Sequence, residues 1–333
     1  MQKGKASIEF SHPPVIVGHG NVVGKKEGEG PLGSLFDQIE EDPMVGAASW
    51  EEAESTLQKR AAESAIKNAG LKNKDIRYLL AGDLLGQLIA TSFGLMDLEI
   101  PLFGLYGACS TMGEAMTLGS ILVDGGYADR VVSLASSHFA SAEKQFRFPL
   151  EYGNQRPFSA TWTVTGSGAV VLSKRGEGPK VAGITPGKIV DMGLKDSMNM
   201  GACMAPAAAD TICQHLQDFK RCPDDYDRII TGDLGVVGKQ ILEEFLDGQG
   251  FDIRDRHMDC GIEIFDSSSQ DTHAGGSGCG CSAVVLTSYV LPKLKSGEWK
   301  RVLFVPTGAL LSTVSFNEGQ SVPGIAHGLV IEA

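Results

Sequence analysis

Apolar and polar residues alternate along this chain in blocks that predict strands and helices in turn. Short apolar runs bounded by glycine or charged residues predict buried strands. Apolar residues at helical spacing predict amphipathic helices at 54–69 and 207–219. Strands that alternate with helices are typical of an α/β protein with a buried sheet. The predicted strands are 14–18, 78–84, 130–135, 166–172, 181–185, 228–234, 301–305 and 326–331.

The same succession of elements occurs twice, which indicates an internal duplication. Residues 126–135 align without gaps with residues 297–306, and this register places Cys109 opposite Gly280. We therefore predict two pseudo-symmetric halves whose equivalent turns converge on one central site. The expected halves are residues 1–175 and 176–333, and the other paired segments are 111–123 with 282–294, 78–84 with 228–234, and 166–172 with 326–331.

Composition narrows the classes of partner and the compartment. The net charge of −12 and the absence of a Lys/Arg-rich run argue against a nucleic-acid partner. No apolar run approaches the about 18 residues that span a bilayer, and no secretory signal opens the sequence, so we expect a soluble cytoplasmic protein. The seven cysteines are an odd number and are expected to be reduced. Cys279 and Cys281, with His273 nearby, lack the usual spacing of a zinc site, so we interpret them as a buried pair of small residues at a glycine-rich helix start.

Cys109 is the main candidate for chemistry. It lies in the segment 105–114, LYGACSTMGE, which turns from a loop into a helix of small and apolar residues. The N–H groups and dipole of a helix start favour a thiolate, which makes a cysteine nucleophilic. The alternative is that Cys109 only packs, because cysteine is among the most buried residue types.

Strand ends supply further candidates. Asp83, Ser136, Asp233 and Thr307 lie at or just beyond the ends of predicted strands, at the positions where α/β sheets bind their ligands. We therefore expect these side chains to line the central site.

Two long connections break the symmetry between the halves. Residues 138–165 and 235–277 lengthen them, and long connections in compact domains are often functional or interfacial. The first carries Arg147, Asn154 and Arg156, and the second carries the polar run 266–273. The glycine-rich segment 15–25 fits no nucleotide-binding spacing, and we interpret it as a glycine-rich turn.

Two segments resemble the thiolase-like superfamily, and the resemblance covers nearly the whole chain. Residues 108–110, ACS, are similar to the nucleophile motif of ketoacyl synthases, and residues 272–278, THAGGSG, are similar to the histidine segment of thiolases. The resemblance implies a five-layered αβαβα fold and a homodimer. It also implies that Cys109 and His273 would be the catalytic residues if the protein is an acyltransferase.

The sequence departs from the enzymes of that superfamily at two places. Asp233 stands where the synthases have a catalytic histidine, and its charge would oppose an oxyanion. The late glycine-rich motif that approaches the thioester carbonyl is absent, and residues 307–318 stand in its place. We therefore expect a scaffold that has lost part of its catalytic apparatus, with an active Cys-dependent acyltransferase as the alternative.

The complete pattern is similar to the stage V sporulation protein AD family. The segments that carry this are 11–18, 106–114, 136–140 and 271–278. The resemblance implies a protein that binds dipicolinic acid during sporulation and germination, with calcium accompanying the ligand. It also implies other membrane subunits of the same complex as partners, and peripheral association with the spore inner membrane through them. A third hypothesis is an adaptor that only docks membrane subunits.

On this hypothesis we predict eight ligand-binding residues: Asp83, Cys109, Ser136, His138, Arg147, Arg156, Asp233 and His273. Dipicolinate carries two negative charges at neutral pH, so Arg147 and Arg156 are expected to contact its carboxylates, with surface or dimer salt bridges as the alternative.

The remaining predicted residues each have an alternative role. His273 could orient a ligand carboxylate, pair with Cys109, or only cap a helix, and His138 could line the pocket or serve a hinge or interface. Asp83 and Asp233 would repel a free dianion, so they suit either calcium or a structural role at a strand end. The Ser136 hydroxyl could bond the ligand or only backbone.

Overall fold

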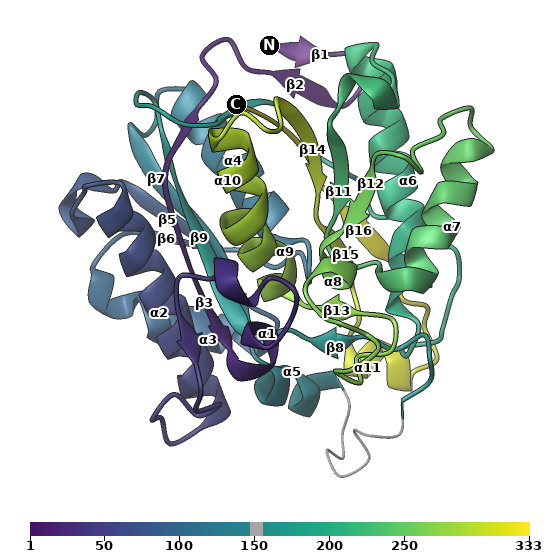
Figure 1. Cartoon of the computed structure of the whole chain (residues 1–333), viewed down its shortest axis with the longest axis horizontal. Coiled ribbons are helices and arrows are strands. Elements are labelled where there is room, and N and C mark those ends of the chain that lie inside the picture. Colours follow the sequence, from purple (N-terminus) through teal and green to yellow (C-terminus); the bar gives the residue numbers. More distant parts are fainter. Residues whose placement is uncertain (147–155) are drawn as a thin grey trace.

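The computed structural model describes residues 1–146 and 156–333, and its elements form five layers, alternately helical and β (Figure 1). One outer layer contains α2 (Trp50–Asn68) and α3 (Ile89–Leu95), and the other contains α6 (Met200–Phe219) and α7 (Gly235–Asp247). Two halves of one sheet lie inside these helices and enclose a central helical layer. The predicted αβαβα arrangement is therefore present.

The strand order repeats in the two halves of the sheet. The first half runs β3 (Val15–Gly24), β9 (Gly166–Ser173), β7 (Arg130–Ser137), β5 (Tyr78–Gly82), β6 (Leu102–Gly104). The second runs β10 (Lys180–Thr185), β17 (Gly328–Glu332), β14 (Arg301–Val305), β11 (Arg228–Thr231), β12 (His257–Asp259). If the five strands of each half are numbered in chain order, both halves have the same spatial order, 1-5-4-2-3. The repeated order supports the predicted duplication, while the boundary at residue 175 stays a prediction.

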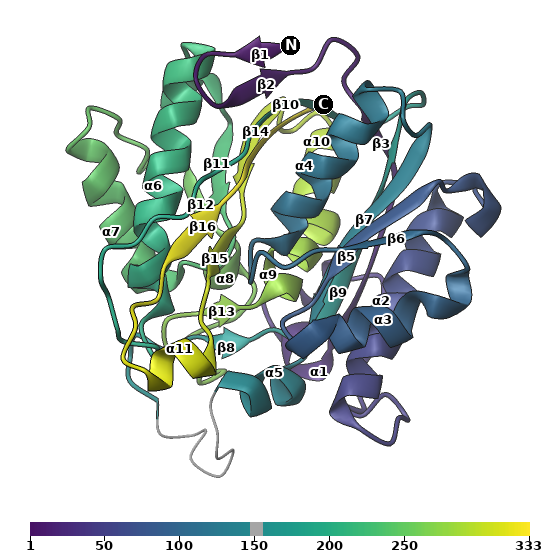
Figure 2. The same cartoon turned by 180° about the vertical axis from the view of Figure 1, so that it is seen from behind.

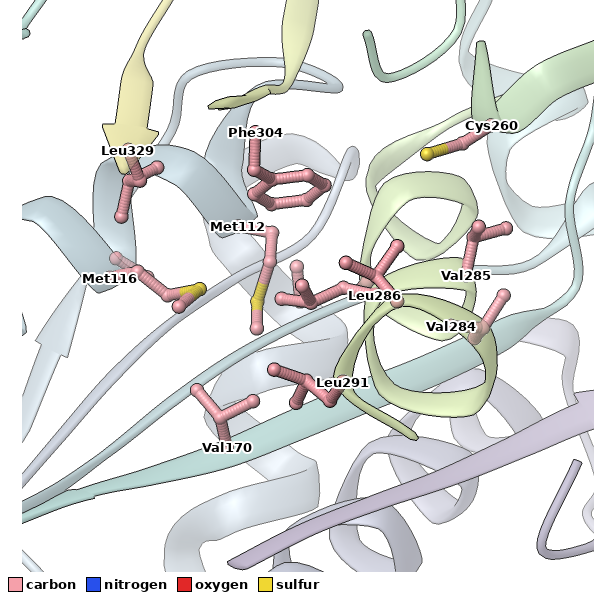
Figure 3. Close-up of a cluster of buried hydrophobic side chains, with 14 of the residues drawn as sticks. Met112, Met116, Val170, Cys260, Val284, Val285, Leu286, Leu291, Phe304 and Leu329 are labelled. Carbon is pink, nitrogen blue, oxygen red and sulfur yellow. The ribbon is translucent and has the colours of Figure 1, made fainter. Parts of the chain in front are cut away.

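The halves share a core in the central layer. This layer contains α4 (Thr111–Asp124), α9 (Cys279–Val285) and α10 (Leu291–Lys295), the last two joined by a π-helical turn at Leu286–Val290. Figure 3 shows Met112 of α4, Leu286 and Phe304 of β14 close together, and all three are fully buried. Because these side chains come from both halves, neither half covers its own apolar face alone.

The interpretation of the glycine-rich segment 15–25 as a turn is wrong, whereas the strand predicted at 14–18 is confirmed and continues to Gly24. Residues Val15–Gly24 form β3, which runs the length of the first half beside β9. A Cβ atom on Gly18 would lie 2.6 Å from the carbonyl oxygen of Ala65, and one on Gly20 would lie 2.6 Å from Cβ of Ser64. These glycines therefore allow helix α2 to pack closely on the strand.

The N-terminal hairpin belongs to the second half. Strand β1 (Gln2–Lys3) pairs with β2 (Ser7–Glu9), and β2 pairs with β10, so the hairpin lies beside α6 in both views (Figures 1 and 2). Asp218 of α6 accepts hydrogen bonds from the N–H groups of Lys5, Ala6 and Ser7, and from the Ser7 hydroxyl. The Asp218 carboxylate therefore binds the N-terminal hairpin, residues 1–9, to α6.

Shorter elements connect and cover these layers. Among the described residues, no helix is both long and apolar enough to span a bilayer. The shorter elements are α1 (Lys25–Gly28), β4 (Ile39–Glu40), α5 (Phe139–Phe146), β8 (Trp162–Thr163), α8 (Cys260–Glu263), β13 (Gly276–Ser277), β15 (Thr307–Ala309), α11 (Thr313–Asn317) and β16 (Gly324–Ala326).

Candidate functional site

Cys109 lies in the tight turn that precedes α4 and is only 5% exposed. Ala108 has a positive φ of 49°, an unusual conformation for a residue with a side chain. The Ser110 hydroxyl donates to the Gly107 carbonyl at 2.7 Å, and the Thr111 hydroxyl donates to the Ala108 carbonyl at 2.6 Å. These two bonds hold the turn that presents the sulfur.

Asp233 and Ser277 of the second half meet Cys109. The Ser277 hydroxyl oxygen lies 3.8 Å from Cys109 Sγ and donates to Asp233 Oδ2 at 2.8 Å. The Gly278 N–H donates to the same carboxylate oxygen at 3.1 Å, and the Thr307 hydroxyl donates to Oδ1 at 2.8 Å. The carboxylate is therefore occupied by protein donors, and Ser277 connects it to the thiol.

The electrostatics of this group keep Cys109 protonated. Burial raises the pKa of Asp233 to about 6, against the opposing effect of its hydrogen-bond donors. Burial, and then the nearby Asp233 charge, raise the pKa of the Cys109 thiol well above its usual range. Desolvation and a neighbouring anion therefore oppose the stabilisation of a thiolate that the helix start is expected to provide.

The space beside the sulfur is small. The cavity at Cys109 has a volume of about 20 Å³, room for roughly one water molecule. An outer basin of about 420 Å³ adjoins it, and the two share Leu84, Tyr106 and Leu311 as lining. The cavity is also lined by Ala108, Glu143, Thr163, Met200, Ser277 and Ala309. The basin also has Leu85, Gly86, Gln87, Leu88, Gln145, Leu310, Ser312 and Thr313.

His273 and Arg156 lie together, away from Cys109. His273 Nδ1 is 2.9 Å from the Pro157 carbonyl oxygen, and its Nε2 is 3.1 Å from Asp271 Oδ1. Arg156 donates to the carbonyl and carboxylate oxygens of Asp271, both at 3.0 Å, and packs on the Trp162 ring. Neither side chain lines the Cys109 cavity or the basin. The structure therefore does not pair His273 with the thiol.

Asp83 and Ser136 belong to a separate buried cluster. Asp83 accepts from the N–H of Leu85 and from the N–H and hydroxyl of Thr91, which fixes the turn into α3. The Ser136 hydroxyl donates to Glu54 of α2 at 2.9 Å. Of the four strand-end residues expected to line the site, none lines the cavity, although Asp233 and Thr307 form the group behind Ser277.

His138, another predicted residue, is not at the cavity either. His138 Nε2 lies 2.8 Å from the Pro43 carbonyl oxygen, and its Nδ1 accepts the Ala140 N–H. Its ring lies beside Trp50, in another pocket. Arg147 lies outside the described residues.

Ser277, Tyr106 and Glu143 were missed by the sequence reasoning. Ser277 stands four residues after His273 in the glycine-rich segment, so the similarity to thiolases pointed to the right segment and the wrong side chain. Tyr106 and Glu143 come from connections whose paths no periodicity predicts. The predicted interpretation of Cys279 and Cys281 is confirmed, because both are fully buried in the first turn of α9. All seven cysteines are unpaired.

Sequence comparisons match one family over almost the whole chain. The family model described as stage V sporulation protein AD matches residues 4–332. The stage V sporulation protein AD of Bacillus subtilis (strain 168) is 46% identical over 329 residues, which cover 99% of this chain and 97% of that protein.

Solved structures of OleA and of a 3-oxoacyl-[acyl-carrier-protein] synthase III share the fold. An OleA variant from Xanthomonas campestris matches with a TM-score of 0.62 at 12% identity, covering 98% of both chains. The 3-oxoacyl-[acyl-carrier-protein] synthase III of Aquifex aeolicus matches with a TM-score of 0.59 at 11% identity, covering 96% of this chain and 100% of that one. At this identity the likeness shows the fold alone, and the predicted thiolase-like fold is confirmed.

Proposed function

Because the chain belongs to the stage V sporulation protein AD family, we propose that it is a sporulation protein that binds dipicolinic acid on a thiolase-like scaffold without catalysing acyl transfer. The family membership and the fold are the starting point. The ligand is the one that the family resemblance implies. Dipicolinate can arrive as the free dianion or as its calcium chelate, in which case calcium is cargo.

The arrangement of Cys109, Ser277 and Asp233 is the observation that supports a binding protein without acyltransferase activity. A condensing cysteine needs a thiolate, a group that accepts or donates its proton, and donors for the oxyanion. Here burial, and then the adjacent Asp233 carboxylate, raise the pKa of the thiol, and the polar groups beside it are that carboxylate and the Ser277 hydroxyl. Among the described residues, no histidine lines the cavity.

The basin is the better place for the ligand. Its volume of about 420 Å³ lies within the range of roughly 300–1,000 Å³ typical of small-molecule sites, whereas the Cys109 cavity is too small unless Leu311 or Tyr106 moves. Amide and hydroxyl groups of Gln87, Gln145 and Ser312 line the basin and could donate to carboxylates. The described lining contains no lysine or arginine. Arg147 follows α5 directly in the chain and stays the predicted cation.

We further propose a homodimer that forms through β6. Strand β6 is the free edge of the first half of the sheet, and Leu102 and Phe103 are 40% and 47% exposed. The opposite edge strand, β12, is buried. An open edge with exposed apolar side chains favours pairing with the same edge of a second copy about a two-fold axis. Association with the spore membrane would then occur through other subunits of the complex.

Calorimetric titration of dipicolinate, with and without calcium, tests the ligand. We expect saturable binding to the wild-type protein, and a loss of binding in Leu311→Trp, which fills the junction of cavity and basin. Val314→Trp is the matched control, because Val314 is 67% exposed on α11 and lines neither space. No saturable binding with either form of the ligand would overturn the proposal.

A second measurement distinguishes the proposed binding protein from the alternative, an active Cys-dependent acyltransferase. Incubation with acyl-CoA thioesters followed by intact-mass measurement should show no adduct. An adduct that disappears in Cys109→Ala would instead identify a Cys-dependent acyltransferase.

A further inference from the structure

A second pocket lies between α1 and the start of α5. It shares no lining residue with the proposed dipicolinate site. Its volume is about 410 Å³, within the usual range for small-molecule sites. Its lining contains four aromatic rings, those of Trp50, His138, Phe139 and Trp162, together with lysine and glutamate side chains. We call it the aromatic pocket.

The aromatic side chains of this pocket are held in fixed pairs. The rings of Phe139 and Trp162 stack with their centroids 4.1 Å apart and their planes 1° from parallel. The His138 ring lies 5.5 Å from Trp50 and is anchored by its contact with the Pro43 carbonyl oxygen. Preformed aromatic surfaces bind a flat ring at low entropic cost.

One buried polar atom in the lining lacks a partner. Glu27 is 1% exposed, and its Oε1 accepts the Thr165 N–H at 3.0 Å, whereas Oε2 has no hydrogen-bond partner among the described residues. Burial raises the pKa of this carboxyl to about 7. A buried carboxylate oxygen without a donor is costly, and a ligand N–H or O–H group would satisfy it.

The charges around the pocket disfavour an anionic ligand. Lys25 lies 3.1 Å from Glu41 and 4.0 Å from Glu29, so its charge is balanced. Lys26 donates to the Gln270 carbonyl oxygen at 2.5 Å. The ammonium of Lys26 also lies over the Trp162 ring, 4.2 Å from its centroid. The lining contains three acids, Glu27, Glu29 and Glu41, against two lysines, so a dianion such as dipicolinate would meet an excess of negative charge here.

We propose that the aromatic pocket binds a small, flat, neutral aromatic molecule whose N–H or O–H donor reaches the free carboxylate oxygen of Glu27. The stacked rings supply the contact area, and Glu27 supplies the orientation. The site also adjoins the proposed dipicolinate site through one short helix: His138 and Phe139 lie at the start of α5, while Glu143 and Gln145, further along α5, line the cavity and the basin. The inference does not depend on dipicolinate binding.

Tryptophan fluorescence provides a direct test. Two of the three tryptophans, Trp50 and Trp162, line the pocket, and the third, Trp299, packs edge-on against Tyr289. In a Trp299→Phe background the emission therefore comes from the pocket alone. The probe is benzimidazole, a neutral aromatic with one N–H donor, at about pH 8, where Glu27 with a pKa of about 7 is mostly ionised. We expect a saturable change in emission.

Matched probes and variants separate this site from non-specific quenching. 1-Methylbenzimidazole lacks the donor and should bind at least roughly tenfold more weakly, since hydrogen bonds to charged groups are worth about 1.5–3 kcal/mol. Glu27→Gln should weaken benzimidazole similarly, because its amide N–H would face the donor, and Ala140→Phe should abolish binding by filling the pocket. Leu311→Trp, read by saturation-transfer NMR, should leave it unchanged.

Several results would overturn the proposal. These are equal affinity for the two probes, unchanged binding in Ala140→Phe with native circular dichroism, or no saturable change at millimolar probe.

Discussion

The sulfur of Cys109 lies 3.8 Å from the hydroxyl oxygen of Ser277. These residues come from the two halves of the chain, at segments that the duplication places near one another. Ser277 in turn donates to Asp233, so the hydroxyl links the thiol to a buried acid. This geometry accounts for the raised pKa of the Cys109 thiol, because burial and the Asp233 charge both disfavour a thiolate.

Asp233→Asn should lower the pKa of the Cys109 thiol, because it removes the neighbouring negative charge that helps to raise it. At a fixed pH near about 8, alkylation of Cys109 by a small thiol reagent should then be faster, by roughly tenfold for each unit of pKa. The measurement is intact mass against time in a Cys222→Ser background, since Cys222 is the exposed cysteine. An unchanged rate would show that Asp233 does not control the thiol.

Glu54→Gln should remove a pH dependence of stability. Burial, and then the nearby Asp83, raise the pKa of Glu54 to about 8 in the folded protein, above the ordinary value of 4.5. The folded state therefore holds a proton that the unfolded state releases, and the free energy of unfolding falls as pH rises from about 4.5 to about 8. The variant should lose this pH dependence, which changes the free energy of unfolding by on the order of a few kcal/mol over that range. Denaturant unfolding across this range measures it, with exposed Glu63→Gln as the control.

Asp218→Asn should weaken the attachment of the N-terminal hairpin. Burial opposes ionisation of Asp218, but the donors from Lys5, Ala6 and Ser7 outweigh it and lower the pKa to about 2. A lowered pKa stabilises the fold above the ordinary value of 3.8, and that contribution is lost as pH falls from about 3.8 to about 2. We expect a loss of about 1–2 kcal/mol at neutral pH. Faster hydrogen exchange confined to residues 1–9 would identify the cause, and exchange unchanged there would contradict it.

Gly18→Ala should destabilise the protein by about 1–3 kcal/mol or more, because the new methyl group would lie 2.6 Å from the Ala65 carbonyl oxygen and push α2 off the sheet. Gly86→Ala is the control, since the nearest atom to its new methyl group, Gln145 Oε1, would be 3.9 Å away and Gly86 is exposed. Thermal or denaturant unfolding compares the two. Equal stability would mean that strand and helix can separate without cost.

Leu102→Lys should shift the proposed homodimer toward monomer, because it places a charge on the open edge strand β6. Light scattering coupled to gel filtration reports the mass. Val314→Lys is equally charged and lies on α11, outside this edge, so it should leave the mass unchanged. A wild-type monomer at micromolar concentration would contradict the proposed dimer.

The fold could be predicted from the sequence because its signals are local and occur twice. Apolar runs marked the strands around Leu79 and Ile229, and the repeated register placed the helices that start at Thr111 and Cys279 in equivalent positions. The failure at Gly18 and Gly20 has a physical cause: glycine marks both turns and close packing, and only the neighbouring helix distinguishes them.

The site was less predictable because it depends on side-chain directions between distant segments. Cys109 and Asp233 were rightly placed near one another by the duplication, but no pattern shows that His273 turns toward Asp271 while Ser277 faces the thiol. Whether the predicted residues bind a ligand stays a prediction.

The N-terminal arm has a consequence for how the duplicated halves can be divided. Residues 1–9 come first in the chain, yet they pair with β10 and are clasped by α6, so they complete the half that is synthesised last. A single cut near residue 175 would leave residues 1–9 on the fragment that contains the first half, separated from β10 and α6. A circular permutation could instead join the two termini and open the chain near residue 175. Residues 1–9 would then directly follow the second half in the chain and keep their contacts with β10 and α6.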